Sequence, residues 1–493
     1  MRRPITRREF LQRASLGALA VSGLPQPAFA RAFSARPTGA APKRIVVLGA
    51  GLSGLAAAFE FVQAGHDVTI LEARTRAGGR VLTLRDGFAD GLYAEAGAIF
   101  VPDHHQDLMR YLRQFDVPLD LLPSSDRSAL YYVQGRRLRV TMGQPVNWPV
   151  ELRPDEQGLA PEALFAHYLQ SLVSQIGDPT SASWPPDNLK QYDAVSVAEF
   201  ARQQGASPGA LTVMRLAGPI NLVGEGIDSI SLLWAMRYLT DLFGARQTYV
   251  IRGGSDQLPS AFVSRLGDRV RYSAPVVRIA HTPQDVTVTY LRDGAPATLT
   301  GDYAVCTVPF AVLRDLEVAP PFSPPKTRAI NELPQTSVTR VFLQTRTRFW
   351  SDQGDPGFAS TDLPIMTCLD AAVNQAGPRG IMMSFQGGDQ ARQTAAQSED
   401  ERVATAVREM EKVYPGMAGS YEWGTSYSWD QDPWARGDYA WMQPGQFTAL
   451  EPYIGTPEGR VYFAGEHASP WPGWMQGALW SGLRAARAIM ETP

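Results

Sequence analysis

The feature that most constrains this chain is a glycine-rich turn set between a short apolar strand and a helix. Residues 43–48 (KRIVVL) are rich in β-branched side chains and predict a buried parallel strand. The turn GAGLSG follows at residues 49–54, and residues 55–63 predict a helix. This order of strand, spaced glycines and helix predicts a dinucleotide-binding βαβ unit.

Each glycine of the turn has a physical role in such a unit. Gly49 permits the tight turn, Gly51 lets the backbone approach a pyrophosphate, and Gly54 lets the helix pack closely on the strand. The helix that follows would point its N-terminal N–H groups and the positive end of its dipole at the pyrophosphate.

The segment after the helix indicates which dinucleotide is bound. A second strand is predicted over residues 67–71 and ends at Glu72, an acid placed to bind a ribose diol. The same acid would repel the 2′-phosphate of NADP. Gly78-Gly79-Arg80 follows closely and fits a cofactor that stays bound along its length.

The far end of the chain supplies a second part of this site. Residues 460–465 predict a strand that stops before Glu466, where an acid can bond the ribityl hydroxyls of a flavin. Residues 473–478 (GWMQGA) then open a final helix, whose N–H groups would stabilise an anionic reduced flavin. We therefore expect FAD as the cofactor.

The chain between these two parts is mixed, with mostly helices predicted over residues 150–245 and strands over 270–288, 303–309, 338–344 and 380–385. We expect a mixed α/β fold: a discontinuous FAD-binding dinucleotide fold with an inserted substrate-binding domain and a helical subdomain. The expected boundaries are a signal peptide at 1–30, a linker at 31–42, an FAD-binding domain from 43–98, 252–320 and 455–493, a substrate-binding domain from 99–145 and 321–454, and a helical subdomain at 146–251.

The N-terminus has the three parts of an export signal. Thr6-Arg7-Arg8-Glu9-Phe10-Leu11 is a twin-arginine pattern, residues 14–24 are apolar, and Ala28-Phe29-Ala30 is a small-x-small cleavage site. We expect export of the folded protein to the periplasm or beyond. The apolar run is too short for a stable membrane span. The formal net charge of -3 gives no reason to expect nucleic acid as a partner.

The cysteines and histidines predict no metal site. Cys306 and Cys368 have neither metal-ligand spacing nor the pattern of a disulfide framework, although a single disulfide stays open. His104 and His105 are expected at a helix start, and His467 is as well explained by packing as by a role near the cofactor.

Over residues 43–488 the chain resembles the flavin monoamine oxidases and L-amino acid oxidases, with L-amino acid oxidases most similar in ordered alignment. Besides the glycine turn, the motifs that carry the resemblance are GGRV at 78–81, YAEAGA at 93–98, GGSDQLP at 253–259, CTVP at 306–309, RFW at 348–350, YFAGEH at 462–467 and SGLRAA at 481–486.

The resemblance implies an FAD site in which residues 97–100 lie along the flavin and Val276 reads the adenine through its backbone. The implied cofactor residues are Gly49, Gly51, Leu52, Ser53, Gly54, Glu72, Ala73, Arg74, Gly79, Arg80, Gly97, Ala98, Ile99, Phe100, Val276, Gly465, Glu466, Gly473, Trp474, Met475, Gln476 and Ala478.

Two departures from the L-amino acid oxidases concern the substrate carboxylate. The resemblance places Phe100 where those enzymes carry an arginine, and Phe385 where they carry a tyrosine. An arginine fork is the natural partner of a carboxylate, and a buried carboxylate without a partner is unfavourable. An amine without the carboxylate is therefore the expected substrate.

Two aromatic residues match the cage of amine oxidases. Tyr439 and Trp474 fall at its two positions, although each is also explicable as an ordinary core residue, and Tyr238 is added as a pocket residue. Asp438 stands where covalent monoamine oxidases carry the cysteine that links the flavin, so noncovalent FAD is expected.

A third departure concerns reoxidation. Family members usually hold a water near flavin N5 with a lysine, and the matching residue here is Arg340. Arginine keeps the charge but not the compact ammonium geometry, which puts fast reaction with oxygen in doubt. Arg340 would instead be a surface strand residue if the alignment is out of register.

The resulting hypothesis is FAD-dependent oxidation of an amine C–N bond to the imine by hydride transfer to flavin N5, with O₂ reoxidising the flavin to give H₂O₂. Tyr439, Trp474 and Arg340 are the expected catalytic residues. Three alternatives stay open: an L-amino acid oxidase with Arg340 as the carboxylate anchor, a periplasmic dehydrogenase using a cytochrome or quinone, and a flavin-stabilised binding protein. A homodimer is an option that the sequence does not decide.

Overall fold

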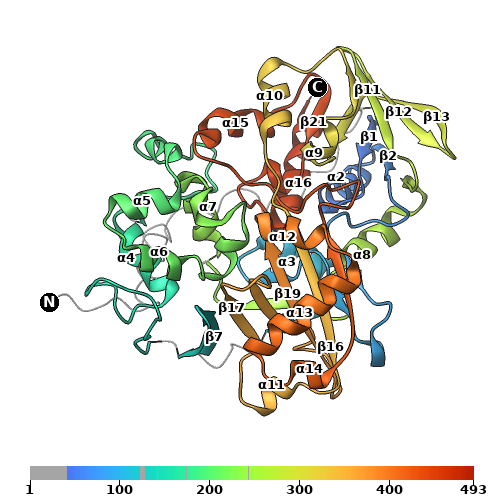
Figure 1. Ribbon diagram of the computed structural model, residues 1–493. Helices are drawn as coiled ribbons and strands as arrows, with labels where there is room; N and C mark the ends of the chain where they lie inside the picture. Colours follow the sequence, from blue (N-terminus) through green and yellow to red (C-terminus); the bar gives the residue numbers. More distant parts are fainter. Residues whose placement is uncertain (1–40, 123–127, 142, 174, 243, 493) are drawn as a thin grey trace.

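The chain folds into a mixed α/β structure, as expected, with several separate sheets and many helices (Figure 1). The computed structural model describes residues 41–122, 128–141, 143–173, 175–242 and 244–492. The twin-arginine motif and nearly all of the linker therefore lie outside the described residues.

A five-stranded parallel sheet forms the dinucleotide unit. Its strand order is β10-β2-β1-β14-β21. The strands are β1 (Arg44–Leu48), β2 (Asp67–Leu71), β10 (Val270–Arg271), β14 (Tyr303–Cys306) and β21 (Val461–Phe463). All five lie within the three separate stretches expected for the FAD-binding domain, although the domain boundaries themselves remain predictions.

Three helices pack around this sheet: α2 (Leu52–Gln63), α8 (Gln257–Leu266) and α16 (Met475–Glu491). The prediction of a helix start at residue 55 was wrong by one turn. Gly51 has an extended conformation (φ -71°, ψ 171°) and serves as the N-cap, so the helix begins directly after it. Strand β14 also ends earlier than expected, because Pro309 turns the chain into α9 (Phe310–Leu313).

A four-stranded sheet, β13-β12-β11-β15, lies beyond the dinucleotide unit at the upper right of Figure 1. Its strands are β11 (Val276–His281), β12 (Val286–Arg292), β13 (Ala295–Gly301) and β15 (Glu317–Ala319). Their alternating burial, clearest in β12, is typical of a sheet with one solvated face.

A seven-stranded sheet carries the substrate side of the molecule, with strand order β20-β16-β19-β18-β17-β7-β8. Its strands are β7 (Ser128–Val133), β8 (Arg136–Thr141), β16 (Val338–Thr345), β17 (Phe358–Thr361), β18 (Thr367–Asp370), β19 (Gly380–Gly387) and β20 (Tyr421–Ser428). Every residue of β16 and β19 is buried, which shows that both faces of the sheet centre are covered.

One face of that sheet packs on α13 (Glu399–Val413) and the opposite face on residues near the dinucleotide unit. Val341 and Leu343 belong to the first face, whereas Val338 and Phe342 belong to the second. Because side chains alternate along a strand, Arg340 faces the same way as Val338 and Phe342.

Two small sheets join these bodies: β3 (Thr83–Leu84) with β4 (Ala94–Glu95), and a ribbon of order β5-β9-β6. The ribbon consists of β5 (Phe100–Pro102), β6 (Leu119–Leu121) and β9 (Thr248–Ile251). Helix α3 (Gln106–Gln114) lies between β5 and β6 in the sequence. Its N-cap is His105, so the expected helix start is confirmed.

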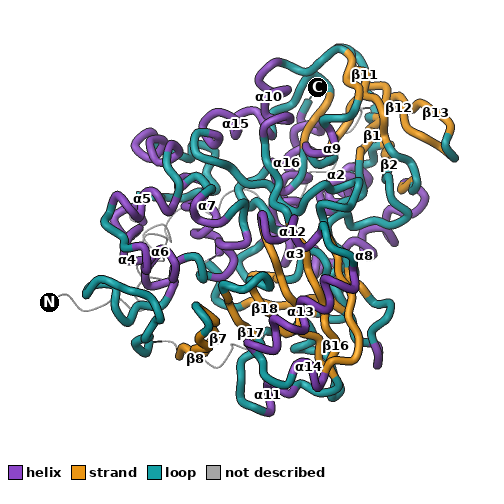
Figure 2. Tube along the Cα trace, in the orientation of Figure 1, coloured by secondary structure: helices purple, strands orange, loops and turns teal. Residues whose placement is uncertain are grey.

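The expected helical segment is present and gathers at the left of the molecule (Figure 2). It contains α4 (Pro161–Val173), α5 (Val197–Gln203), α6 (Pro208–Met214) and α7 (Leu232–Leu242). The remaining α-helices are α10 (Pro324–Glu332), α11 (Phe349–Asp352), α12 (Gly388–Ala395), α14 (Met417–Ser420) and α15 (Gln446–Ile454), and the 3-10 turns are η2 (Ala89–Gly91), η3 (Asp187–Ala194), η4 (Gly218–Leu222), η5 (Gly226–Asp228), η6 (Gly267–Arg269) and η7 (Glu466–Ala468).

Both cysteines are buried and free, so the single disulfide left open by the sequence does not form. Cys306 ends β14 and Cys368 lies in β18. Among the described residues, no helix combines the length and apolar character that crossing a membrane requires.

Candidate active site

One cavity of about 1270 Å³ lies at the carboxyl ends of β1, β2, β14 and β21 and extends to the seven-stranded sheet. Open parallel sheets bind their ligands at this edge. The cavity exceeds the 300–1,000 Å³ or so that encloses a drug-sized ligand, and so has room for a dinucleotide and a substrate.

The glycine turn fits a closely approaching phosphate group. Gly49 has a φ of +106°, and a Cβ there would lie 2.6 Å from the Thr307 side-chain oxygen. A Cβ on Gly54 would lie 2.1 Å from the Gly49 carbonyl oxygen, whereas one on Gly51 would meet no protein atom within 4 Å. Gly51 lines the cavity, so the space beside it belongs to a ligand.

Glu72 lies at the cavity wall and organises the loops around it. Its carboxylate accepts hydrogen bonds from the main-chain N–H groups of Ala50 (2.7 Å) and Arg74 (2.8 Å). These bonds hold the end of β2 against the glycine turn, beside the place where a ribose would lie.

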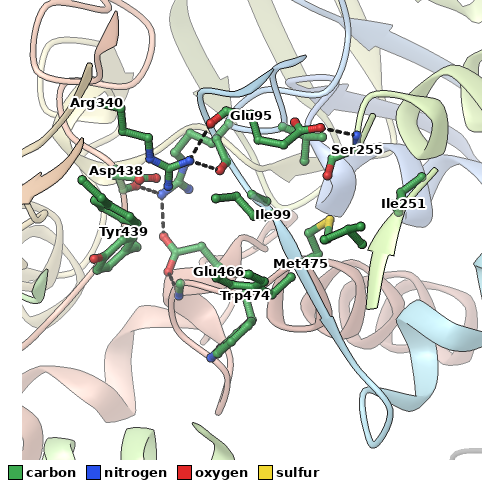
Figure 3. A pocket seen from close by; sticks show the side chains of 18 of the residues that line it. Glu95, Ile99, Ile251, Ser255, Arg340, Asp438, Tyr439, Glu466, Trp474 and Met475 are labelled. Carbon is green, nitrogen blue, oxygen red and sulfur yellow. Dashed lines mark hydrogen bonds and ion pairs between the residues drawn. The ribbon is translucent and has the colours of Figure 1, made fainter. Parts of the chain in front are cut away.

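A second buried carboxylate connects three segments of the flavin end (Figure 3). Glu466 accepts from Arg80 Nη1 at 2.8 Å and from the Gly473 N–H at 3.0 Å. Arg80 also donates to the Asp438 main-chain carbonyl. The ion pair therefore fixes the start of α16 relative to the loop that contains Asp438 and Tyr439.

The two predicted cage residues both line the cavity. The Tyr439 hydroxyl donates to the Leu222 carbonyl at 2.7 Å, which fixes that ring. Trp474 is the N-cap of α16, and its ring meets the ring of His105 edge-on at 5.1 Å. Between them, Gly473 takes a φ of +80° that lets the chain turn beside the Tyr439 ring.

Arg340 is not a surface residue, so that alternative from the sequence was wrong. The side chain is buried and points into the cavity, where its Nη1 donates to the carbonyls of Glu95 (2.9 Å) and Gly97. Its guanidinium carbon lies 4.1 Å from the centre of the Phe385 ring. Burial lowers its pKa, and Nε has no hydrogen-bond partner within the described residues.

The three predicted pocket residues also line the cavity. Phe385 lies on β19 beneath Arg340, and Phe100 begins β5. Tyr238, on α7, stacks on Trp234 with ring centres 5.1 Å apart. Burial raises the pKa of the Tyr238 hydroxyl, which keeps that group neutral.

Asp438 is a buried carboxyl group at the substrate end. Burial raises its pKa to about 6, an effect that the positive charges of Arg340 and Arg80 oppose. The Asp438 residue lines the cavity next to Tyr439 and carries no thiol with which to attach a flavin.

The structure brings together nearly all of the predicted site residues. Two predicted cofactor residues do not line the cavity, namely Gly54 and Gln476. Gly54 packs against the turn, as its predicted role requires. The Gln476 side chain instead accepts from the N–H groups of Asp107 and Leu108 and so caps α3. His467 packs against Phe310 and also does not line the cavity.

Sequence reasoning missed several residues that line the substrate end, among them Leu222, Leu369 and Met383. Met383 could have been found, because it lies two residues before Phe385 on a predicted strand and therefore faces the same way. Leu369 could not have been found from the sequence, because its position depends on the pairing of β18 with β19.

The adjacent histidines meet an acid that the sequence does not place near them. His104 Nε2 lies 2.9 Å from Asp241 Oδ1, and His105 Nε2 lies 3.2 Å from the same oxygen. Both imidazole Nδ1 atoms are buried, and within the described part of the chain neither has a hydrogen-bond partner. His105 packs against the ring of Trp474 and does not itself line the cavity.

Comparisons with known proteins agree with this geometry. The profile of the family described as flavin containing amine oxidoreductase matches residues 52–490. YobN of Bacillus subtilis (strain 168), named provisionally as an L-amino-acid oxidase, is 35% identical over 468 residues, which cover 92% of this chain and 95% of that protein. The L-amino-acid oxidase BmooLAAO-I of Bothrops moojeni is 29% identical, with 91% and 89% covered.

Among solved structures, cyclohexylamine oxidase from Brevibacterium oxydans IH-35A superposes with a TM-score of 0.79 at 24% identity, covering 92% of this chain and 99% of that one. Putrescine oxidase bound to putrescine superposes with a TM-score of 0.77 at 22% identity, covering 91% and 99%. These two likenesses concern the fold.

Proposed function

The chain belongs to the family of flavin-containing amine oxidoreductases, and from this premise we propose the class of amine that it oxidises. Family membership makes it an amine-oxidising enzyme with FAD as its cofactor. The proposed substrate is a hydrophobic or aromatic amine without an α-carboxylate. The product is the imine, which water hydrolyses to an aldehyde or ketone.

The observation that carries this proposal is the state of the three residues best placed to meet a carboxylate. Phe100 and Phe385 offer no hydrogen-bond donor to one. Arg340 is occupied, because it lies on the Phe385 ring and donates to two main-chain carbonyls. A carboxylate pressed against the two rings would lose its water without a replacement partner, at a cost of several kcal/mol.

The chemistry supplied by bound FAD is acceptance of a hydride equivalent from the carbon next to nitrogen. Tyr439 and Trp474 would hold the substrate between their rings and so orient its C–N bond. Their apolar surroundings disfavour the ammonium form, which leaves the amine neutral with its lone pair available. No side chain has to remove a proton from carbon in this scheme.

One observation favours a second candidate, an L-amino acid oxidase. Arg340 Nε is buried and has no hydrogen-bond partner among the described residues, so a reoriented guanidinium could offer this donor to a carboxylate. The sequence relatives named as L-amino-acid oxidases favour the same candidate. It requires the Arg340 side chain to swing away from Glu95 and Gly97 toward the substrate.

Two further parts of the proposal concern the electron acceptor and the compartment. We propose O₂ as acceptor, with H₂O₂ formed, and a periplasmic cytochrome or quinone as the alternative that Arg340 in place of lysine favours. The twin-arginine pattern supports export of the folded protein. An oxygen electrode compared with a dye acceptor separates the two acceptors.

Anaerobic stopped-flow reduction with matched pairs, such as tyramine and tyrosine, tests the substrate class. We expect tyramine to reduce the flavin at least tenfold more efficiently than tyrosine. A preference for tyrosine that disappears in Arg340→Ala would make Arg340 the carboxylate anchor and the chain an L-amino acid oxidase.

A further inference from the structure

The cavity does not end at the cage residues but continues outward between two walls. On one side lies the seven-stranded sheet, and on the other the three-stranded ribbon. We call this continuation the outer channel and define it by six lining residues: Leu121, Thr248, Val250, Leu369, Val373 and Met383. Five of the six are aliphatic or thioether side chains, so they form an apolar track along the channel, beside polar lining residues such as Gln247 and Asn374.

The register of the strands explains how the channel starts at the proposed substrate site. Phe385 pairs with Thr367 and Met383 pairs with Leu369 across β18 and β19. Met383 therefore follows Phe385 on the same face, roughly 7 Å farther along the strand at about 3.3 Å per residue. On the facing ribbon, Phe100 pairs with Val250. On the sheet wall Phe385 is followed by Met383, and on the ribbon wall Phe100 stands beside Val250.

The outer end of the channel opens to solvent through side chains that soluble proteins usually bury. Leu121 is 51% exposed and Val373 is 37% exposed, and both line the cavity. Asn374 Nδ2 donates to the Leu121 carbonyl at 3.4 Å, which links the two sides of this rim. An apolar rim continuous with an apolar channel fits a ligand that is apolar along its whole outer part.

Among the residues that the structure describes, the charged side chains near the channel offer no site for a second ammonium group. The Asp370 carboxylate accepts hydrogen bonds from the Trp350 indole N–H and the Ala372 N–H, so it already has protein partners. Asp355 pairs with Arg137 and Arg139. Arg246, exposed at the cavity wall, is positive and would repel a distal cation.

We infer that the outer channel binds the tail of the substrate, and that the substrate is a primary monoamine with a long alkyl or arylalkyl chain. This inference rests on the proposed amine oxidation and adds the length and charge of the tail. The amine end lies between Tyr439 and Trp474, and the tail passes Phe385, Met383 and Leu369 toward the rim.

A chain-length series with the FAD-loaded enzyme tests the inference. Flavin reduction is measured anaerobically with n-alkylamines from butylamine to decylamine and with 1,8-diaminooctane. We expect the efficiency of reduction to rise about two- to fourfold per methylene, up to the fourfold that full burial of a methylene supplies. Octylamine should exceed 1,8-diaminooctane at least tenfold.

Two matched variants place the effect in the channel. Val373→Asp, at the rim, should lower the decylamine-to-butylamine ratio about threefold. Val277→Asp makes the same change at a site with 38% exposure on β11. Val277 is not a cavity-lining residue, although the neighbouring Val276 is, and the change should leave the ratio unchanged. Leu369→Asp, inside the channel, should lower the ratio at least tenfold.

An efficiency independent of chain length, a preference for the diamine, or equal ratios in Val373→Asp and Val277→Asp would each overturn the inference. These outcomes leave a preference for tyramine over tyrosine intact. Loss of that preference instead overturns the proposed substrate class, so the two failures are distinguishable.

Discussion

The two ends of the cavity are built in different ways. At the dinucleotide end, the glycine turn, Glu72 and the loop at 78–80 all come from one segment, residues 49–80, and distant segments complete the lining. At the substrate end, side chains arrive from β5, α7, β16, β19 and the loops before α15 and α16. A local segment can therefore specify the glycine turn and the ribose acid of the first end, whereas the second end exists only after the whole chain has folded.

The two ends also differ in how they hold charge. Glu72 satisfies its carboxylate with nearby main-chain N–H groups. At the substrate end, Arg340 and Asp438 are both buried in an apolar site, where each retains an electrostatic cost. The glycine turn and Glu72 thus form a cradle whose hydrogen bonds are already made, whereas Arg340 and Asp438 are held in a site where burial disfavours their charged forms.

The largest expected effect concerns whether the substrate end holds FAD covalently. Acid or heat denaturation should release all of the flavin into the supernatant, because Asp438 offers no thiol for a covalent bond. The absorbance of the supernatant and of the washed precipitate measures this. Flavin retained on the precipitated chain would mean that the cofactor is bound covalently, and would contradict the prediction.

The next effect tests Glu72, the charged residue of the cradle. Glu72→Ala should weaken FAD binding by about 1.5–3 kcal/mol, or roughly 10- to 150-fold, because a charge-assisted acceptor is lost. Titration of the apoprotein with FAD measures the affinity. Glu72→Gln keeps an acceptor and should recover part of the loss, whereas equal affinity in all three proteins would remove Glu72 from the ribose.

A pair of glycine variants separates the fold of the cradle from its fit to a ligand. Gly54→Ala places a Cβ 2.1 Å from a main-chain oxygen and should lower the stability of the apoprotein by about 1–3 kcal/mol. Gly51→Ala meets no protein atom, so it should leave that stability unchanged and weaken FAD binding. Normal FAD affinity in Gly51→Ala would mean that no phosphate approaches this turn.

The smallest effect concerns the buried Asp438 carboxyl at the substrate end. Burial raises the pKa of Asp438 to about 6 from 3.8, so the folded protein favours the protonated acid. Its contribution to stability is complete below about pH 4 and is lost as the pH rises through about 6. Asp438→Asn should therefore gain about 1–2 kcal/mol over the natural chain between pH 5 and pH 8, measured by denaturant unfolding. A constant difference would contradict the raised pKa.

The contrast between the ends explains what the sequence could predict. The turn at 49–54 and the strand before Glu72 are local patterns, whereas the start of α2 and the end of β14 were misplaced. Phe100, Phe385 and Arg340 were found by resemblance to a family. The cap that Gln476 provides to α3 and the contact of His105 with Asp241 join distant segments, and no local pattern encodes such pairs.

The register that aligns Leu369 with Met383 is a further case of this kind. It depends on the lengths of the connections between β17, β18 and β19 and on which face of the sheet is covered. Side-chain alternation predicts which residues of one strand share a face, but not which residue of the neighbouring strand stands opposite. The apolar channel was therefore invisible in the sequence.

The burial of the two cysteines has a consequence for an enzyme that would work in the presence of its own peroxide. Hydrogen peroxide oxidises thiolates, and a thiol kept protonated and out of solvent is inert toward it. Burial raises the pKa of Cys306 to about 11 and also raises that of Cys368, so both remain thiols at neutral pH. With oxygen as the acceptor, cysteine oxidation would not limit the number of turnovers before inactivation.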